Sequence, residues 1–209
     1  MKKIILTVLI FGLAAMLSGC GPLIGLFVVP LIPKPVIKAE YEMESKKVLV
    51  WVDIEINMES NPALRRELSE RIEKELMDRK LAKSVVGYGS MHNIRIEQDS
   101  DLDLTVEAIG KRCGADQVLH VVVEQFGLKH VAGKEYNDPI VSGTAQLIDV
   151  ETGQRLWPTD QMTKAFYAQE NFSTGDETFR VNEIISKLCI KATFEITKYF
   201  YDRKGRHTR

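Results

Sequence analysis

Three side chains in the middle of the sequence are of the types that bind metal ions. His120 and Glu124 are four residues apart in an apolar stretch, and His130 follows in a polar segment. Residues four apart in a strand lie on the same face, so the pair could supply two ligands of a metal-dependent hydrolase. No second pair has metal-ligand spacing, and a half-buried histidine is commonly satisfied by ordinary hydrogen bonds. We therefore expect neither a metal site nor a cofactor.

A second candidate pair is Asp53 and Glu55, which alternate along one face of an apolar segment. Two carboxylates on one face could share acid–base work, but the exposed end of a strand explains them better. The sequence has no Gly-x-Ser-x-Gly, no phosphate-binding glycine loop and no His-Glu-x-x-His. We expect a protein that is not an enzyme, with no catalytic residue and no small-molecule substrate.

The strongest chemical signal is Cys20. Lys2 and Lys3 precede an uncharged apolar run, residues 4–16, of the length that an export signal uses, and Leu17-Ser18-Gly19-Cys20 follows at once. These four residues resemble the lipobox of bacterial lipoproteins, which implies cleavage before Cys20 and acylation of that cysteine by diacylglycerol and palmitate-like chains. Two or three such chains hold a domain at a membrane, because each buried methylene contributes roughly 0.8 kcal/mol.

The lipobox predicts a signal peptide over residues 1–19, lipidation at Cys20 and a location in the cell envelope. Gly21 stands where an aspartate often favours retention in the inner membrane of lipoproteins, so the outer membrane, facing the periplasm, is favoured. The alternative is an uncleaved transmembrane helix, because residues 4–32 carry no charge. Lys2 and Lys3 on the cytoplasmic side place the residues beyond about 35 outside the cytoplasm in both cases.

Residues 20–46 are predicted to be a tether and linker. Leu23–Ile32 is unusually apolar for a lipoprotein tether, and the prolines at 30, 33 and 35 disfavour a regular helix or a central strand. We expect this segment to contact the membrane, a neighbouring subunit or the domain itself. Residues 36–46 are charged and form a linker or an edge strand.

Residues 47–201 have the patterns of one folded domain, followed by a basic tail at 202–209. Apolar periodicity, caps and turn residues predict an α/β (α+β) fold with a mixed sheet of about five strands and three helices, in the order β-α-β-α-β-β-β-α. Phe126–Pro139 is expected to be a hairpin connection or a loop, and the segment up to Asn171 could continue the last strand. The expected strands are 47–56, 84–88, 117–125, 141–150 and 154–157, and the expected helices are 62–80, 100–113 and 178–201.

Two stretches in this domain carry a family signature: Gly114-Ala115-Asp116-Gln117-Val118-Leu119, and Ala145 to Gln154 (AQLIDVETGQ). They resemble the G-A-D-x-V-L and a-x-L-x-D-x-x-T-G patterns of envelope proteins with the TolB N-terminal domain fold, a family that includes the lipoproteins CsgG and LpoB. The resemblance covers roughly Lys47 to Tyr201 and implies a role by contact with other proteins. Phe126–Pro139 is too short and polar for a membrane-spanning hairpin.

The remaining residues of interest are cysteines and tryptophans. Cys113 and Cys189 fall on apolar helix faces, so free core thiols are favoured over a bridge, which export would permit. Trp51 and Trp157 lie on expected strands and should pack in the core. With 28 Lys and Arg against 29 Asp and Glu, the chain has no charge excess that favours nucleic acid.

Three functions follow, in order of preference. The first is a lipid-anchored binding, assembly or regulatory module for another envelope protein, with the membrane contacted through acylated Cys20. The second is a subunit of an oligomeric secretion or transport complex, with Leu23–Ile32 packed between subunits or in the membrane. The third, a metal-dependent hydrolase, depends only on His120, Glu124 and His130.

Overall fold

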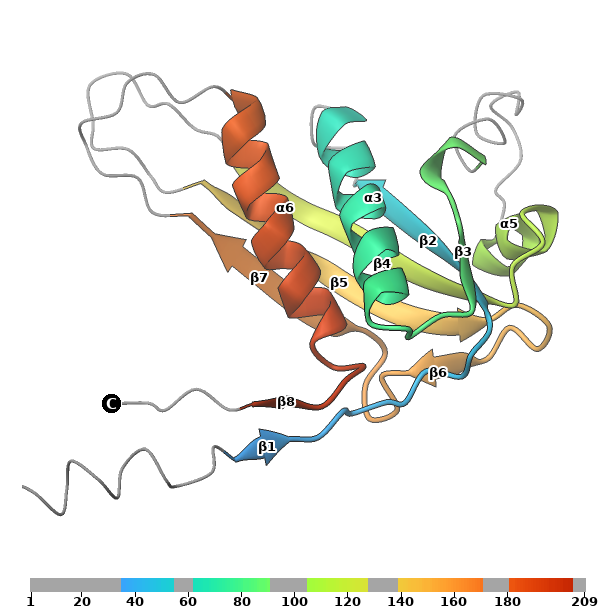
Figure 1. Cartoon of the computed structure of the whole chain (residues 1–209). Coiled ribbons are helices and arrows are strands. Elements are labelled where there is room, and N and C mark those ends of the chain that lie inside the picture. Colours follow the sequence, from blue (N-terminus) through green and yellow to red (C-terminus); the bar gives the residue numbers. More distant parts are fainter. Residues whose placement is uncertain (1–34, 55–61, 91–104, 128–138, 171–180, 205–209) are drawn as a thin grey trace, which may run out of the picture. The chain divides into compact units, whose positions relative to one another are not determined.

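A mixed β-sheet organises the protein in the computed structural model, which describes residues 35–54, 62–90, 105–127, 139–170 and 181–204 (Figure 1). The strand order is β3-β2-β4-β5-β6, and β7 also pairs with β5. Strand β2 runs parallel to β3 and β4, whereas β5 runs antiparallel to β4, β6 and β7. The strands are β2 (Lys47–Ile54), β3 (Ser84–Val86), β4 (Gln117–Gly127), β5 (Ile140–Asp149), β6 (Arg155–Trp157) and β7 (Lys164–Gln169).

Helices α3 (Pro62–Asp78), α5 (Val106–Arg112) and α6 (Val181–Thr197) accompany this sheet. The α+β class predicted from the sequence is confirmed, as is the central position of β4. The sheet has six strands because the segment after Trp157 forms β7 separately, pairing with β5 beyond the point where β6 ends. None of the helices in the described part of the chain is long and apolar enough to cross a membrane.

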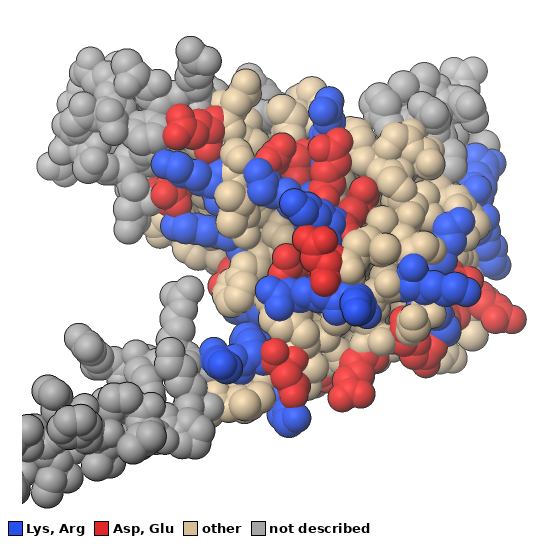
Figure 2. Space-filling model, viewed as in Figure 1, with Lys and Arg blue, Asp and Glu red and all other residues tan. Residues whose placement is uncertain are grey.

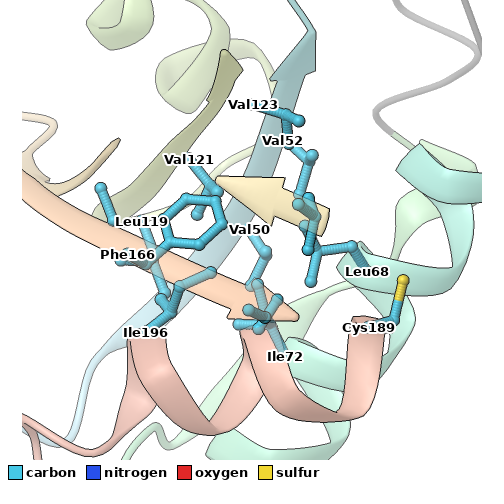
Figure 3. Close-up of a cluster of buried hydrophobic side chains, with 14 of the residues drawn as sticks. Val50, Val52, Leu68, Ile72, Leu119, Val121, Val123, Phe166, Cys189 and Ile196 are labelled. Atoms are coloured by element: carbon cyan, nitrogen blue, oxygen red, sulfur yellow. The ribbon is translucent and has the colours of Figure 1, made fainter. Parts of the chain in front are cut away.

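One face of the sheet carries the main core, under α3 and α6 (Figure 3). Alternate residues of β2 and β4 point into it, as the two-residue period of a strand requires, and they meet the four-residue apolar row of α3. Its members include Val48, Val50, Val52, Leu64, Leu68, Ile72, Leu76, Leu119, Val121, Val123, Phe166, Leu188, Cys189 and Ile196. Trp157 is also buried here, so its predicted packing role is confirmed.

The other face of the sheet is covered differently. A smaller core of Leu49, Trp51, Val118, Ile109 and Val150 gathers under the short helix α5. Both faces of β2 are therefore buried, as its continuous apolar start predicted.

The solvent side of α3 carries interleaved charges, as its sequence predicted (Figure 2). Arg66 pairs with Glu70 at 3.0 Å, and Arg71 pairs with Glu67 at 2.6 Å, each one helical turn away. Such exposed pairs contribute little stability and keep a helix face solvated.

The compact unit spans Lys38–Arg203 and therefore includes residues 38–46. The backbone N–H groups of Glu40 and Tyr41 donate to the carbonyl oxygen of Tyr199 at 2.8 and 3.2 Å. Lys38 forms an ion pair with Asp202 at 2.7 Å. The short strands β1 (Val36–Ile37) and β8 (Arg203–Lys204) form a separate two-stranded sheet. The signal peptide, Cys20 and Leu23–Ile32 lie outside the described residues.

Two expected element ends in the first half of the domain are wrong. The predicted strand 84–88 ends at Val86, because the chain then turns and the Ser90 N–H donates to the Gly87 carbonyl at 3.0 Å. The helix expected from Ser100 begins at Val106, because Thr105 has extended backbone angles and caps it, its side chain accepting from the Ala108 N–H at 3.4 Å.

Two element ends in the second half of the domain also differ from the expected ones. Strand β4 continues through Phe126 and Gly127, which were expected in a loop, because a bulge after Val123 restores its pairing with β5. The last helix ends at Thr197 instead of Tyr201, and the Phe200 N–H donates to the Thr197 carbonyl at 3.0 Å in the turn that follows. This turn brings Phe200 into the main core.

Candidate binding face beside α5

A concavity of about 860 Å³ lies on the face of the sheet that α5 partly covers. Strands β2, β4 and β5 form its floor, helix α5 forms one wall, and the turn between β5 and β6 forms another. Its lining residues are Trp51, Asp53, Thr105, Val106, Glu107, His120, Gln146, Ile148, Gly153, Gln154 and Arg155.

The centre of the floor is a row of three side chains from three strands. Trp51 of β2 is the register partner of His120 of β4, which is in turn the partner of Gln146 of β5. The indole and imidazole ring centroids are 5.4 Å apart with an interplanar angle of 51°. On the other side of His120, its Nδ1 lies 3.4 Å from Nε2 of Gln146. The indole and the amide thus hold the imidazole from both sides.

The α5 wall sits close to the sheet because Gly110 faces it. A Cβ atom at Gly110 would lie 2.5 Å from a methyl carbon of Val150 and 2.8 Å from one of Val118. Glu107, in the first turn of α5, lines the concavity, and the hydrogen bond with the Thr105 side chain holds the pKa of its carboxyl below the usual value. Glu107 is therefore an anion at neutral pH.

The second wall is the turn that the Thr-Gly motif predicted, and it lies against α5, since a Cβ atom at Gly153 would lie 3.4 Å from Cγ of Glu107. Asp149 Oδ1 accepts hydrogen bonds from both the backbone N–H and the hydroxyl of Thr152, each at 2.9 Å. Those hydrogen bonds, that of the Thr152 backbone foremost, lower the pKa of Asp149. Gly153 has a φ of +68°, which a residue with a Cβ rarely adopts. Arg155 follows this turn and lies at the rim of the concavity, where its Nε donates to the Pro158 carbonyl at 3.0 Å.

The charged side chains among the described lining residues are two carboxylates and one guanidinium. Asp53 belongs to the end of β2, Glu107 to α5 and Arg155 to β6. The row of Trp51, His120 and Gln146 and the residues of the turn also line the concavity. Such a surface combines a small number of oriented polar groups with an aromatic floor, which is the usual composition of a recognition site.

The sequence-predicted candidates are only partly brought together here. His120 and Asp53 line the concavity, whereas the partners proposed for them, His130 and Glu55, lie outside the described residues. Glu124 is exposed at the bulge of β4. Among the residues that the structure describes, no group of three His, Cys, Asp or Glu side chains is placed to hold a metal ion.

Cys113 and Cys189 are both free thiols. Cys113 packs against the small core under α5, whereas Cys189 belongs to the main core on the other face of the sheet. The sheet separates them, so the bridge considered from the sequence does not form in this fold.

Several lining residues were not singled out from the sequence. Trp51 was expected only in the core; it is 7% exposed and yet contributes to the floor. No motif marks Glu107, Gln146 or Arg155 in the sequence. Gln146 and Arg155 do lie close to the D-x-x-T-G signature, and this proximity is the one sequence feature that could have indicated them as lining residues.

Comparisons with known proteins find structural similarity without a sequence match. No family model and no curated protein matches the chain. The structure is similar to lipoprotein GNA1162 from Neisseria meningitidis, with 17% identity over 62% of this chain and 86% of that one and a TM-score of 0.43. It is similar to the PelC dodecamer from Paraburkholderia phytofirmans, with 15% identity over 79% and 91% of the two chains and a TM-score of 0.44.

A third similar structure is the C-terminal domain of LpoB from Salmonella enterica, with 19% identity over 63% of this chain and 88% of that one and a TM-score of 0.40. Bacterial lipoproteins are thus among the structures that this chain resembles. At these TM-scores the likenesses carry no inference about function.

Proposed function

We propose that the protein is a lipid-anchored module of the bacterial cell envelope that binds another envelope protein in order to assemble or regulate it. One observation carries the proposal: helices α3 and α6 cover one face of the sheet, while the other face keeps a concavity of about 860 Å³ beside α5. Its aromatic, amide and charged side chains come from five separate elements and can contact a protein surface. The role is non-catalytic.

The anchor completes the proposal. The lipobox at Leu17–Cys20 supports cleavage before Cys20 and acylation of its thiol, and Gly21 supports the outer membrane, facing the periplasm. The G-A-D and T-G signatures support membership of the TolB-like family. Their residues act structurally here, since Oδ2 of Asp116 accepts from the Lys47 N–H and Oγ1 of Thr152 accepts from the Gln154 N–H.

A photo-crosslinking amino acid at Gln146 tests the binding role in living cells. We expect one recurrent crosslinked protein, identified by mass spectrometry, and much weaker crosslinking from the same amino acid at Glu183, which is exposed on α6. If the protein is folded and exported but the amino acid at Gln146 crosslinks to no protein under any growth condition, the proposal is contradicted.

The lipid anchor is tested separately with Cys20→Ala. The wild-type chain should appear in the membrane fraction with the mass of an acylated N-terminal cysteine. The variant should keep its signal peptide and lack the acyl mass. A cleaved wild-type chain in the soluble fraction without an acyl group would refute lipidation. The proposed binding role would be unaffected by this result.

Exposed apolar residues on α6 favour the second candidate function, a subunit of an oligomeric secretion or transport complex. Ile190 and Phe194 are one turn apart and 52% and 40% exposed. In that case Phe194→Ser should lower the sedimentation coefficient of the detergent-solubilised chain. Met162→Ser, at a residue that is 77% exposed, is the control and should change nothing.

A further inference from the structure

The charge pattern of the concavity indicates what kind of segment it takes. Among the described lining residues, Asp53 and Glu107 are acidic and Arg155 is basic. The guanidinium of Arg155 already donates to the Pro158 carbonyl at 3.0 Å. Among the described lining residues, negative charge therefore exceeds positive charge by one, and Lys111 of α5 also acts on the Glu107 carboxylate.

The floor adds a surface that suits a cation. The His120 ring packs on the Trp51 ring, with centroids 5.4 Å apart, and its Nδ1 is engaged by Gln146 at 3.4 Å. Planar guanidinium groups stack on aromatic rings and form paired hydrogen bonds with carboxylates, and an ammonium does the same less directionally.

We propose that this concavity binds an arginine- or lysine-bearing segment of a partner polypeptide, with the cationic side chain between Asp53 and Glu107 and over the half-buried His120 ring, which packs on Trp51. The inference rests on the proposed binding function and specifies the partner for the same face. An acidic segment would place its charges beside the two carboxylates. A second copy docked through this face would bring its own Asp53 and Glu107 toward the same groups.

The test uses the full chain, purified in a neutral detergent, and a fluorescein-labelled peptide of sequence Gly-Arg-Gly-Ser-Gly-Arg-Gly. Fluorescence anisotropy measures its Kd against a matched peptide with glutamine in place of both arginines. We expect the arginine peptide to bind roughly five-fold more tightly or better, with an advantage that shrinks as salt is raised.

Variants of the chain assign the binding to this face. Asp53→Asn with Glu107→Gln should weaken the arginine peptide roughly five-fold, and Arg155→Gln should strengthen its binding. The control is Asp78→Asn with Glu183→Gln, which removes the same charge from α3 and α6 and should change the Kd less than about two-fold. Unchanged thermal melting of each variant establishes that it is folded.

Each other outcome overturns the inference. Equal affinity for the arginine and glutamine peptides shows that charge is not recognised, and equal weakening by the control pair shows general attraction to an acidic protein. Tighter binding of a glutamate version of the peptide shows the opposite specificity. The proposed function is tested separately by the crosslinking at Gln146. Recurrent crosslinking without peptide binding supports the binding module and rejects the cationic segment. Peptide binding without any crosslinked partner supports recognition of a cation and rejects the envelope-protein partner.

Discussion

Lys47 and Asp116 exchange two hydrogen bonds where the parallel strands β2 and β4 begin. The Lys47 N–H donates to Oδ2 of Asp116 at 2.8 Å, and the Asp116 N–H donates to the Lys47 carbonyl at 2.8 Å. The Asp116 carbonyl also accepts from the Val150 N–H at 2.9 Å. One aspartate of the G-A-D signature thus joins the beginnings of two strands to the turn that ends a third.

Replacement of Asp116 by alanine should therefore destabilise the domain. The Lys47 N–H would lose its side-chain acceptor, and we expect the free energy of unfolding to fall by about 1–2 kcal/mol. Urea denaturation followed by circular dichroism measures this. Asp160→Ala, in an exposed connection, is the control, and an equal loss in both variants would contradict the structural role.

Gly143 is required by the close approach of β5 to β4. A Cβ atom there would lie 1.9 Å from the backbone oxygen of Val122, which cannot move aside as a side chain can. Gly143→Ala should lower the unfolding free energy by about 2–4 kcal/mol, since the strands must separate at the bulge. Gly87→Ala is the matched control, because no atom lies within 4 Å of its Cβ position. Equal unfolding free energies for the two variants would contradict the close approach of β5 to β4 at Gly143.

Gln117 offers a stabilising substitution. Its side chain is fully buried, and neither its Oε1 nor its Nε2 has a hydrogen-bond partner among the described residues. A buried amide without partners carries an uncompensated desolvation cost, so Gln117→Met, which keeps the side-chain length, should raise the unfolding free energy by about 1–3 kcal/mol. The exposed Gln125→Met should leave the denaturation midpoint unchanged. Destabilisation by the buried substitution would reveal a partner for the amide.

Glu73 should make stability depend on pH. Burial, opposed by a hydrogen bond from the Tyr88 backbone, raises the pKa of its carboxyl from 4.5 to about 7. The folded state therefore favours the protonated acid, so its stabilising contribution is complete below pH 4.5 and is lost as pH rises through about 7.

We expect Glu73→Gln to remove this dependence and to raise stability at pH 8 by about 1–2 kcal/mol, with little change at pH 4.5. Urea titrations at the two pH values measure the difference. Asp78→Asn, at the end of the same helix, should leave the pH slope of the wild type intact. A slope that survives Glu73→Gln belongs to another group.

The two cysteines of the domain should stay unlinked under oxidation. They lie on opposite faces of the sheet, and burial raises the pKa of the Cys189 thiol to about 12. Iodoacetamide at pH 8 should therefore modify Cys189 only after denaturation, and Cys113, which is half-buried, before it. Intact mass without reductant should show both thiols. A mass two units lower, with a linked peptide joining the two cysteines, would overturn this arrangement.

The sequence alone predicted the features whose causes are local. Strand and helix identity follow from the apolar periods of residues 47–54 and 62–78, and Gly114 and Gly153 end their elements with positive φ, as glycine permits. The lipobox is also local, so Cys20 is a prediction from sequence alone. Element ends were missed where a cap or a distant partner decides them, as at Thr105 and Phe126.

The concavity was decided by tertiary structure. Trp51, His120 and Gln146 are far apart in the sequence and meet only because β2, β4 and β5 pair in one register, since a shift of one residue would turn each side chain to the other face. The same pairing sends Cys113 and Cys189 to opposite faces. Periodicity states which residues share a face of one strand, whereas the site depends on which strands lie side by side.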